Sequence, residues 1–221
     1  MGKAVVIDGP AGSGKSTTAI ELAKKLGFIY LDTGAMYRAI TLKFLNAGIS
    51  DFSDGDKIEK ILSQTTIDIR QNSDNLSIFL DGRDVTGEIR ANEVDGFVSE
   101  VSAVDKVREF MHIQQRDFAK NHDIVAEGRD LGTFVFPGAD VKIFLVADLD
   151  VRARRRMLQK KASEKQLEEF KANLAKRDRI DSSRSHSPLK KADDAIEVDT
   201  SDLSIDQQVE TILSICHQKI A

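Results

Sequence analysis

The chain has 221 residues, of which 41% are hydrophobic and 31% are charged, so it can bury the core of one large domain and stay soluble. Its formal net charge of −4 gives no general argument for a nucleic-acid partner. The lone Cys216 excludes an intramolecular disulfide framework and agrees with a reducing compartment. Without an apolar run of transmembrane length or a signal peptide ahead of the first strand, we expect a cytoplasmic protein with no membrane partner.

The most informative pattern lies near the N-terminus and fits G-x-x-x-x-G-K-[ST]. It consists of Gly9, Pro10, Ala11, Gly12, Ser13, Gly14, Lys15, Ser16 and Thr17, all candidate nucleotide-binding residues. Residues 3–8 before it predict a buried parallel strand, and residues 17–26 after it predict an amphipathic helix. This context favours a phosphate-binding loop over a glycine-rich turn with a chance lysine. In such a loop Lys15 reaches the β- and γ-phosphates, and the Ser16 hydroxyl can ligate magnesium.

A second strand is expected at residues 28–31, ending at Asp32, with a helix directly after it. A polar strand end that runs into a helix is a good place for a ligand in a parallel α/β sheet. Arg38, near the start of that helix, could face the same cleft as the phosphate loop. It could equally be an ordinary solvated helix residue, and the residues alone leave both interpretations open.

After a short helix near residues 51–62, the pattern changes to alternation at 66–70 and 76–80, with a polar stretch at 72–75 between them. Asp81-Gly82 is a tight-turn signal. We therefore expect a small antiparallel sheet of two or three strands inserted at the edge of an α/β chain. A lid-like subdomain that helps to bind substrate is one interpretation, and a decorative insert is the other.

Residues 92–119 predict one or two helices with an apolar stripe from Val94 to Ile113. Ser99 and Arg108 lie off this stripe and would pass as ordinary surface residues.

A further strand at 123–126 ends in Glu127-Gly128-Arg129-Asp130. Glu127 resembles a weak Walker-B carboxylate that could hold magnesium through water. The alternative is a surface ion pair between Arg129 and Asp130.

The charge changes sharply after the next strand, at 141–146. Residues 151–191 contain 14 lysines and arginines against 5 acidic residues, within a chain that is acidic overall. Such a concentration of arginine suggests attraction of a polyanion, although local ion pairs with Asp178 and Asp181 would use part of it. The tail predicts a last strand at 195–198 and an amphipathic helix at 205–220, in which we expect Cys216 to be a buried or half-buried structural thiol and not a nucleophile.

Four segments taken in this order resemble the bacterial cytidylate kinase family, within the nucleoside monophosphate kinases: GPAGSGKST, LDTGAMYR, EGRDLGTFVFP and KRDRIDSSR. The resemblance covers nearly the whole chain. It implies an α/β P-loop fold with a parallel central sheet flanked by helices. It also implies a single domain with its core at 1–62, 91–151 and 187–221, a monophosphate-binding insert at about 63–90 and a helical lid at about 152–186.

The resemblance further implies transfer of the ATP γ-phosphoryl group to CMP or dCMP with Mg²⁺, by a chain that we expect to be a monomer. Thr33 and Arg38 match the family positions that bind the monophosphate. The positions that contact the cytosine edge are matched by Ser99, Arg108 and Asp130. Arg129 and Arg184 match phosphate contacts and, with Lys15, are the expected catalytic residues; Arg177 and Asp181 match positions near the sugar. Glu127 stands where many family members have aspartate, which puts its geometry toward magnesium in question.

Two other functions stay open from the sequence. One is a P-loop kinase for UMP or another small acceptor. The other is a non-catalytic nucleotide switch, against which the absence of an N-K-x-D guanine signature counts. A general base is not expected, because the acceptor oxygen of a monophosphate is already ionised.

Overall fold

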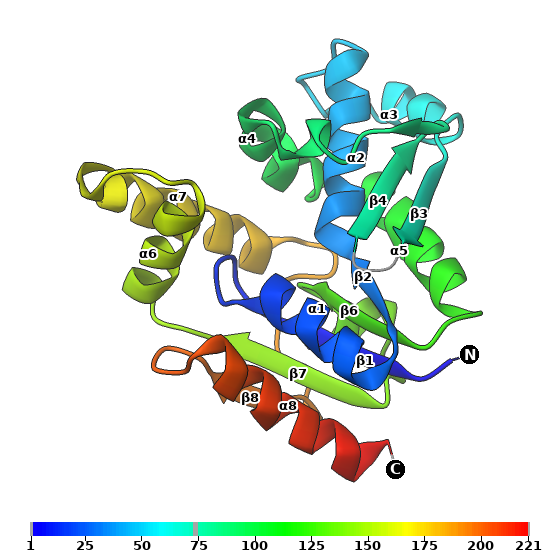
Figure 1. Ribbon diagram of the computed structural model, residues 1–221. Coiled ribbons are helices and arrows are strands. Elements are labelled where there is room, and N and C mark those ends of the chain that lie inside the picture. Colours follow the sequence, from blue (N-terminus) through cyan, green and yellow to red (C-terminus); the bar gives the residue numbers. More distant parts are fainter. Residues whose placement is uncertain (1, 73–74, 221) are drawn as a thin grey trace. The chain divides into compact units, whose positions relative to one another are not determined.

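A five-stranded sheet in the order β2-β6-β1-β7-β8 carries the phosphate-loop motif in this computed structural model (Figure 1). The structure describes residues 2–72 and 75–220. The strands of this sheet are β1 (Ala4–Asp8), β2 (Ile29–Asp32), β6 (Ile124–Gly128), β7 (Val141–Val146) and β8 (Ile196–Asp199). Strand β1 pairs in parallel with β6 and β7, and β7 with β8. Since β1 is buried along its whole length, it is the central strand that its β-branched sequence predicts.

The chain divides into two compact units. One unit comprises the residues up to Leu31 together with those from Ala119 onward, and it contains the five-stranded sheet apart from the last residue of β2. The other unit runs from Asp32 to Phe118. The P-loop and the arginine-rich segment therefore belong to the same unit.

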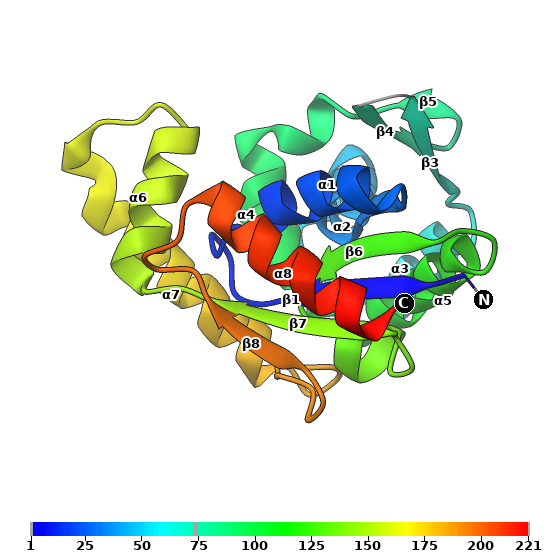
Figure 2. The same ribbon diagram turned by 60° about the horizontal axis from the view of Figure 1, so that its bottom comes forward.

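Helices of the unit that holds the P-loop are α1 (Lys15–Leu26), α6 (Leu149–Gln159), α7 (Leu167–Ser183) and α8 (Ile205–Lys219), with shorter turns at Leu131–Val135 and Glu164–Gln166. Helices α1 and α8 lie side by side (Figure 2). Helices α6 and α7 pack together as a hairpin. Ala153 of α6 and Leu174 of α7 form a buried apolar cluster with Ala11, so the hairpin packs directly on the phosphate loop.

The unit from Asp32 to Phe118 is built on a long helix and a small sheet of its own. Its elements are α2 (Thr33–Asn46), α3 (Gly55–Leu62), β3 (Ile67–Asn72), β4 (Asn75–Leu80), β5 (Arg83–Asp84), a 3₁₀ turn (Glu88–Arg90), α4 (Asn92–Val101) and α5 (Asp105–Ala119). Asp32 caps α2 by accepting a hydrogen bond from the Ala35 amide at 2.8 Å, which ends β2 and starts the helix at this residue. Strands β3, β4 and β5 are antiparallel.

Most of the element order expected from the sequence is confirmed, including the separate antiparallel sheet. Part of the expected polar turn, Ser73 and Asp74, lies outside the described residues. The expectation that Ile113 continues the apolar stripe is wrong, because its side chain is 57% exposed. Val107 and Met111 form the buried face of α5, and a residue two positions after Met111 lies on the opposite side of a helix with 3.6 residues per turn.

Candidate active site

The phosphate loop has the backbone that its glycines predict. Gly9 has a φ of +148°, and a Cβ there would lie 2.2 Å from the Leu145 carbonyl oxygen of the neighbouring strand. Gly14 has a φ of +95° and directly precedes α1. Both positions therefore require glycine, and the loop delivers its last amides to the N-terminus of a helix, where anions bind.

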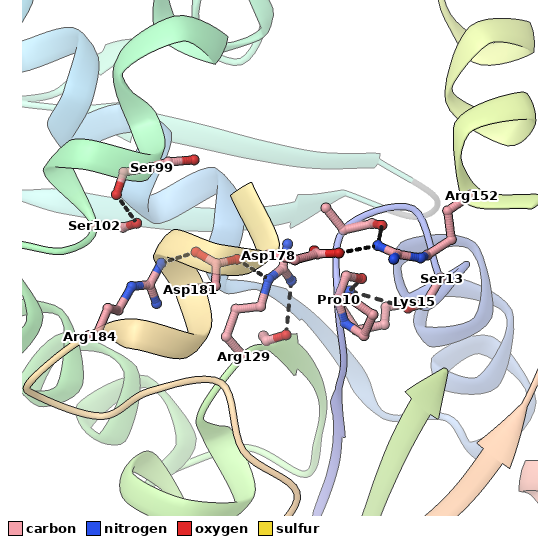
Figure 3. A network of polar contacts seen from close by, with 12 residues as sticks. Pro10, Ser13, Lys15, Ser99, Ser102, Arg129, Arg152, Asp178, Asp181 and Arg184 are labelled. Carbon is pink, nitrogen blue, oxygen red and sulfur yellow. Dashed lines mark hydrogen bonds and ion pairs between the residues drawn. The ribbon is translucent and has the colours of Figure 1, made fainter. Parts of the chain in front are cut away.

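Lys15 is buried at the start of α1, and its ammonium group points back over the loop. Its Nζ donates to the Pro10 carbonyl oxygen at 2.8 Å (Figure 3). Burial, and next the charge of Arg129, lower the pKa of Lys15 to about 7, while Glu127 opposes the shift. A bound polyphosphate would counter both causes, so this ammonium group suits an anionic ligand.

Two carboxylates lie at the carboxyl ends of neighbouring strands. The parallel register pairs Asp8 of β1 with Gly128, next to Glu127 in β6. The Asp8 carboxylate accepts hydrogen bonds from the amides of Leu131, at 3.0 Å, and Gly132, at 2.8 Å. Burial raises the pKa of Asp8 to about 6, although these two amides oppose the shift. Asp8 therefore fixes the turn that directly follows Arg129 and Asp130.

Glu127 is buried and is held by a residue of the adjacent strand β2. The Tyr30 hydroxyl donates to Glu127 Oε1 at 2.6 Å. This bond occupies one carboxylate oxygen and limits the rotation of the side chain, so Glu127 has a defined direction despite being one methylene longer than aspartate.

Arginines from two segments meet at one buried carboxylate, as Figure 3 shows. Arg129 Nε donates to Asp181 Oδ2 at 2.9 Å, and Arg184 forms an ion pair with Asp181 Oδ1. Asp181 is 1% exposed. Burial alone would raise the pKa of Asp181, but Arg129, Arg184 and Arg177 outweigh it and hold that pKa below its usual range. The structure therefore gathers four of the expected site residues.

The arginines of the basic stretch at 151–191 have different surroundings, and its attraction of a polyanion stays a prediction. Arg152 Nη1 donates to Asp178 at 2.6 Å and to the Ala11 carbonyl oxygen at 3.1 Å. Arg155 binds Thr200. Arg154 and Arg179 are exposed. The expected use of Asp178 and Asp181 in local ion pairs is confirmed.

The remaining expected site residues lie in the other unit. Arg38 is buried, so the interpretation as a solvated helix residue is wrong; its Nη1 forms an ion pair with Asp95 of α4 at 2.5 Å. Thr33 is also buried, at the start of α2.

Arg108 is 1% exposed. The expectation that it is an ordinary surface residue, based on its position off the apolar stripe, is therefore wrong. Its Nη1 donates to the Ser102 carbonyl oxygen at 2.9 Å, and its guanidinium lies 5.6 Å from the centre of the Tyr37 ring. Ser99 is half-buried, and its carbonyl oxygen accepts a hydrogen bond from the Ser102 hydroxyl. Arg108 and Ser99 are thus tied to the same turn at the end of α4.

Comparison with known proteins decides between the P-loop families. The family profile described as cytidylate kinase matches residues 5–218 of this chain. The chain belongs to the cytidylate kinase family.

Individual members of the cytidylate kinase family resemble this chain along almost their whole length. A cytidylate kinase from Shouchella clausii is 47% identical over 213 residues, which cover 96% of this chain and 94% of that protein. One from Carboxydothermus hydrogenoformans is 47% identical over 217 residues, covering 97% of each chain. An uncharacterized protein from Eubacterium ventriosum has a similar fold, with a TM-score of 0.52, 13% identity and coverage of 97% of this chain and 98% of that one.

Several residues of this family member carry contacts that the sequence does not reveal. Asp8 could have been noticed as a carboxylate at the end of a buried strand before the loop. Tyr30 and Thr200 gave no comparable signal, because their partners are remote in sequence. Within residues 2–72 and 75–220, no helix is both long and apolar enough to cross a bilayer, and no group of three or more His, Cys, Asp or Glu side chains could hold a metal.

Proposed function

We propose that this chain transfers the γ-phosphoryl group of ATP to CMP or dCMP, giving ADP and CDP or dCDP. The observation that carries the proposal is membership of the cytidylate kinase family. The cationic cluster beside the phosphate loop supports it, because Arg129 and Arg177 lie close enough to Lys15 to lower its pKa. Phosphoryl transfer spreads negative charge over the transferred oxygens, and fixed positive charges stabilise that distribution.

ATP is expected to bind through the amides of the phosphate loop and through Lys15. The Lys15 ammonium group now donates to the Pro10 carbonyl oxygen. A phosphate oxygen offers it a stronger, charge-assisted hydrogen bond. We expect Lys15 to exchange the carbonyl for the β- and γ-phosphates of the donor, with a rise in its pKa.

Acceptor binding is assigned to nine residues, several of which are fixed by a protein partner. In the unit from Asp32 to Phe118 these are Thr33, Arg38, Ser99 and Arg108; in the other unit they are Arg129, Asp130, Arg177, Asp181 and Arg184. Arg38 is oriented by Asp95 and Arg108 by the Ser102 carbonyl. Fixed guanidinium groups lose little conformational entropy when they bind phosphate, and each can bind it bidentately.

Catalysis in this proposal is positioning and charge neutralisation. The acceptor is a phosphate oxygen that is already ionised, so no general base is required. Arg129 and Arg184 stabilise the charge of the transferring group together with Lys15, and holding donor and acceptor in line removes an entropic cost of the reaction. The recognition role assigned to Asp130 is consistent with this chemistry.

The residues present fit a magnesium ion that accompanies the nucleotide. Magnesium prefers hard oxygen ligands and keeps several of its waters. The Ser16 hydroxyl is exposed next to Lys15, and the Glu127 carboxylate, oriented by Tyr30, is close enough to Lys15 to influence its pKa. Bound magnesium would neutralise charge on the phosphates, with Ser16 as a direct ligand and Glu127 as an acceptor for its waters.

We also propose a cytoplasmic location, supported by the buried Cys216, whose thiol pKa is raised to about 11 by burial. Such a thiol is an inert structural group that suits a reducing compartment. That the protein is a monomer stays a prediction.

The proposal is tested by measuring ADP formation from Mg-ATP with CMP, dCMP, UMP or AMP as the sole acceptor. We expect kcat/KM for CMP or dCMP to exceed that for UMP and AMP by about tenfold or more, because the residues assigned to the base edge include the buried Arg108 and Asp130. A preference for UMP would replace the assigned acceptor. ATP binding without transfer to any acceptor would favour a nucleotide switch.

A further inference from the structure

The backbone carbonyl groups of the phosphate loop accept hydrogen bonds from side chains, and these bonds bear on the direction of the loop's amides. In a planar trans peptide, the C=O bond and the N–H bond of the next residue point in opposite directions. A hydrogen bond to one carbonyl therefore sets the direction of the following N–H group. This relation matters here because the N–H groups of such a loop are its phosphate ligands.

Two backbone carbonyls of the loop accept hydrogen bonds from side chains of distant elements. The Ala11 carbonyl accepts from Arg152 of α6 at 3.1 Å, and the Ser13 carbonyl accepts from the Thr200 hydroxyl at 3.1 Å. The peptide of Ser13 carries the N–H of Gly14, the last glycine before Lys15. Thr200 thus controls the direction of an amide at the centre of the motif.

Thr200 is itself firmly placed. It directly follows β8, is 0% exposed, and its amide donates to the Val146 carbonyl oxygen at 2.9 Å. Arg155 holds it with two bonds, from Nη1 to Thr200 Oγ1 at 3.1 Å and from Nη2 to the Thr200 carbonyl oxygen at 2.6 Å. Arg155 is thus a second support, one helical turn from Arg152.

The hydroxyl of Thr200 has one proton and two carbonyls in reach, those of Ser13 at 3.1 Å and Val146 at 3.0 Å. The Val146 carbonyl already accepts the Thr200 amide. Arg155 Nη1 donates a hydrogen bond to Thr200 Oγ1, so the proton of the hydroxyl itself is available to the Ser13 carbonyl oxygen. The arrangement is a relay from Arg155 through Thr200 to the loop.

We propose that Thr200, held by Arg155, is a positioning residue for the nucleoside triphosphate, because it aims the Gly14 amide at the phosphates. Neither side chain needs to touch the ligand. The inference rests on the proposed function, since it names a residue that prepares the donor site of that reaction. It predicts a defect in donor binding that spares the binding of the monophosphate.

The test compares Thr200→Val, which keeps the shape and removes the hydroxyl, with Thr200→Ser, which restores it. Thr211→Val is the matched control, because its exposed hydroxyl bonds only the Gln207 carbonyl of its own helix among the described contacts. We expect Thr200→Val to raise KM for ATP by about tenfold and to leave KM for CMP within about twofold, as one misdirected buried amide implies. Thr200→Ser should restore KM for ATP to within about twofold of wild type.

Equal changes in both KM values, or an unchanged KM for ATP in Thr200→Val, would overturn the proposal. Arg155→Met provides a second test if Thr200→Val fails to fold: it removes both donors to Thr200 and should raise KM for ATP in the same selective way, and an unselective effect would contradict the relay. Calorimetric titration of ADP separates this inference from the proposed function. If the wild type does not phosphorylate CMP, weaker ADP binding by Thr200→Val would still support the role of Thr200.

Discussion

Two sets of arginines in the same unit differ in how they are held. Arg152 and Arg155 of α6 donate to backbone carbonyls of the loop and of Thr200, and Arg152 also pairs with the carboxylate of Asp178. Arg129 and Arg184 instead share the single carboxylate of Asp181. The first set joins α6 to the phosphate loop and to the end of β8, and we expect it to support the protein. The second set gathers around one buried carboxylate, and we expect it to bind a ligand.

Three arginines act on the carboxylate of Asp181. The charges of Arg129, Arg184 and Arg177 together hold the pKa of this buried carboxyl below its usual range. A guanidinium group can bind a phosphate bidentately. The phosphate-binding role of this set therefore stays the prediction that the experiments below test.

The largest effect is expected at Lys15, the residue assigned to the transferred phosphoryl group. Lys15→Ala removes an ammonium group that sits beside Arg129 and the loop. Turnover should fall about 10³-fold, or about 4 kcal/mol, as when an oriented donor to a developing charge is removed. Steady-state kinetics check the loss, with Lys25→Ala on the exposed side of the same helix as the control. Near-normal turnover in Lys15→Ala would refute its assigned role.

Asp8, whose carboxylate holds the turn after Arg129 and Asp130, can be tested through the pH dependence of stability. The pKa of Asp8 is raised from 3.8 to about 6, so between these values the folded state keeps a proton that the unfolded state has released. The free energy of unfolding should therefore fall as pH rises through this window, by up to about 3 kcal/mol from this carboxyl alone. In Asp8→Asn this contribution disappears.

Urea titrations at pH 4 and pH 7 measure this effect. The free energy of unfolding of Asp8→Asn minus that of the wild type should rise by up to about 3 kcal/mol between the two pH values. The exposed Asp193→Asn is the control for removal of an acidic side chain from the surface. A flat difference for Asp8→Asn would show that the buried carboxyl does not titrate in this range.

A smaller effect is expected at Asp130, which is buried next to Arg129 and is assigned to recognition of the cytosine ring. Asp130→Ala should weaken CMP binding by about tenfold and ATP binding by less than about twofold, since one charged hydrogen bond to the acceptor is lost. Calorimetric titration with each nucleotide checks this, with the exposed Asp202→Ala as the control. Equal weakening of both ligands would mean that Asp130 has been misplaced.

The sequence predicts those features that depend on neighbouring residues. The phosphate loop, β1 and α1 follow from spacing and periodicity alone, because the loop's geometry is set by its own glycines. Arg129, Arg177 and Arg184 could be grouped only by resemblance, and the structure brings them to Asp181.

Contacts between remote residues could not be predicted. The hydroxyl of Thr200 lies 187 positions from Ser13, and Asp8 lies 123 positions from Leu131. The burial of Arg108 could not be predicted for the same reason, because its guanidinium group binds a carbonyl at the end of another helix. Local periodicity describes which side of an element is apolar, and it contains no information about which distant polar group meets a buried side chain.

The most direct test of whether the arginines around Asp181 bind phosphate is a double-mutant-type thermodynamic cycle. It removes the phosphate from the ligand and an arginine from the protein, separately and together. Calorimetry should compare CMP with cytidine on the wild type, on Arg184→Ala and on the exposed Arg154→Ala. We predict that the advantage of CMP over cytidine shrinks by about tenfold or more in Arg184→Ala and is unchanged in Arg154→Ala, since a guanidinium–phosphate contact is lost only in the first. An equal advantage of CMP in all three proteins would contradict the assignment.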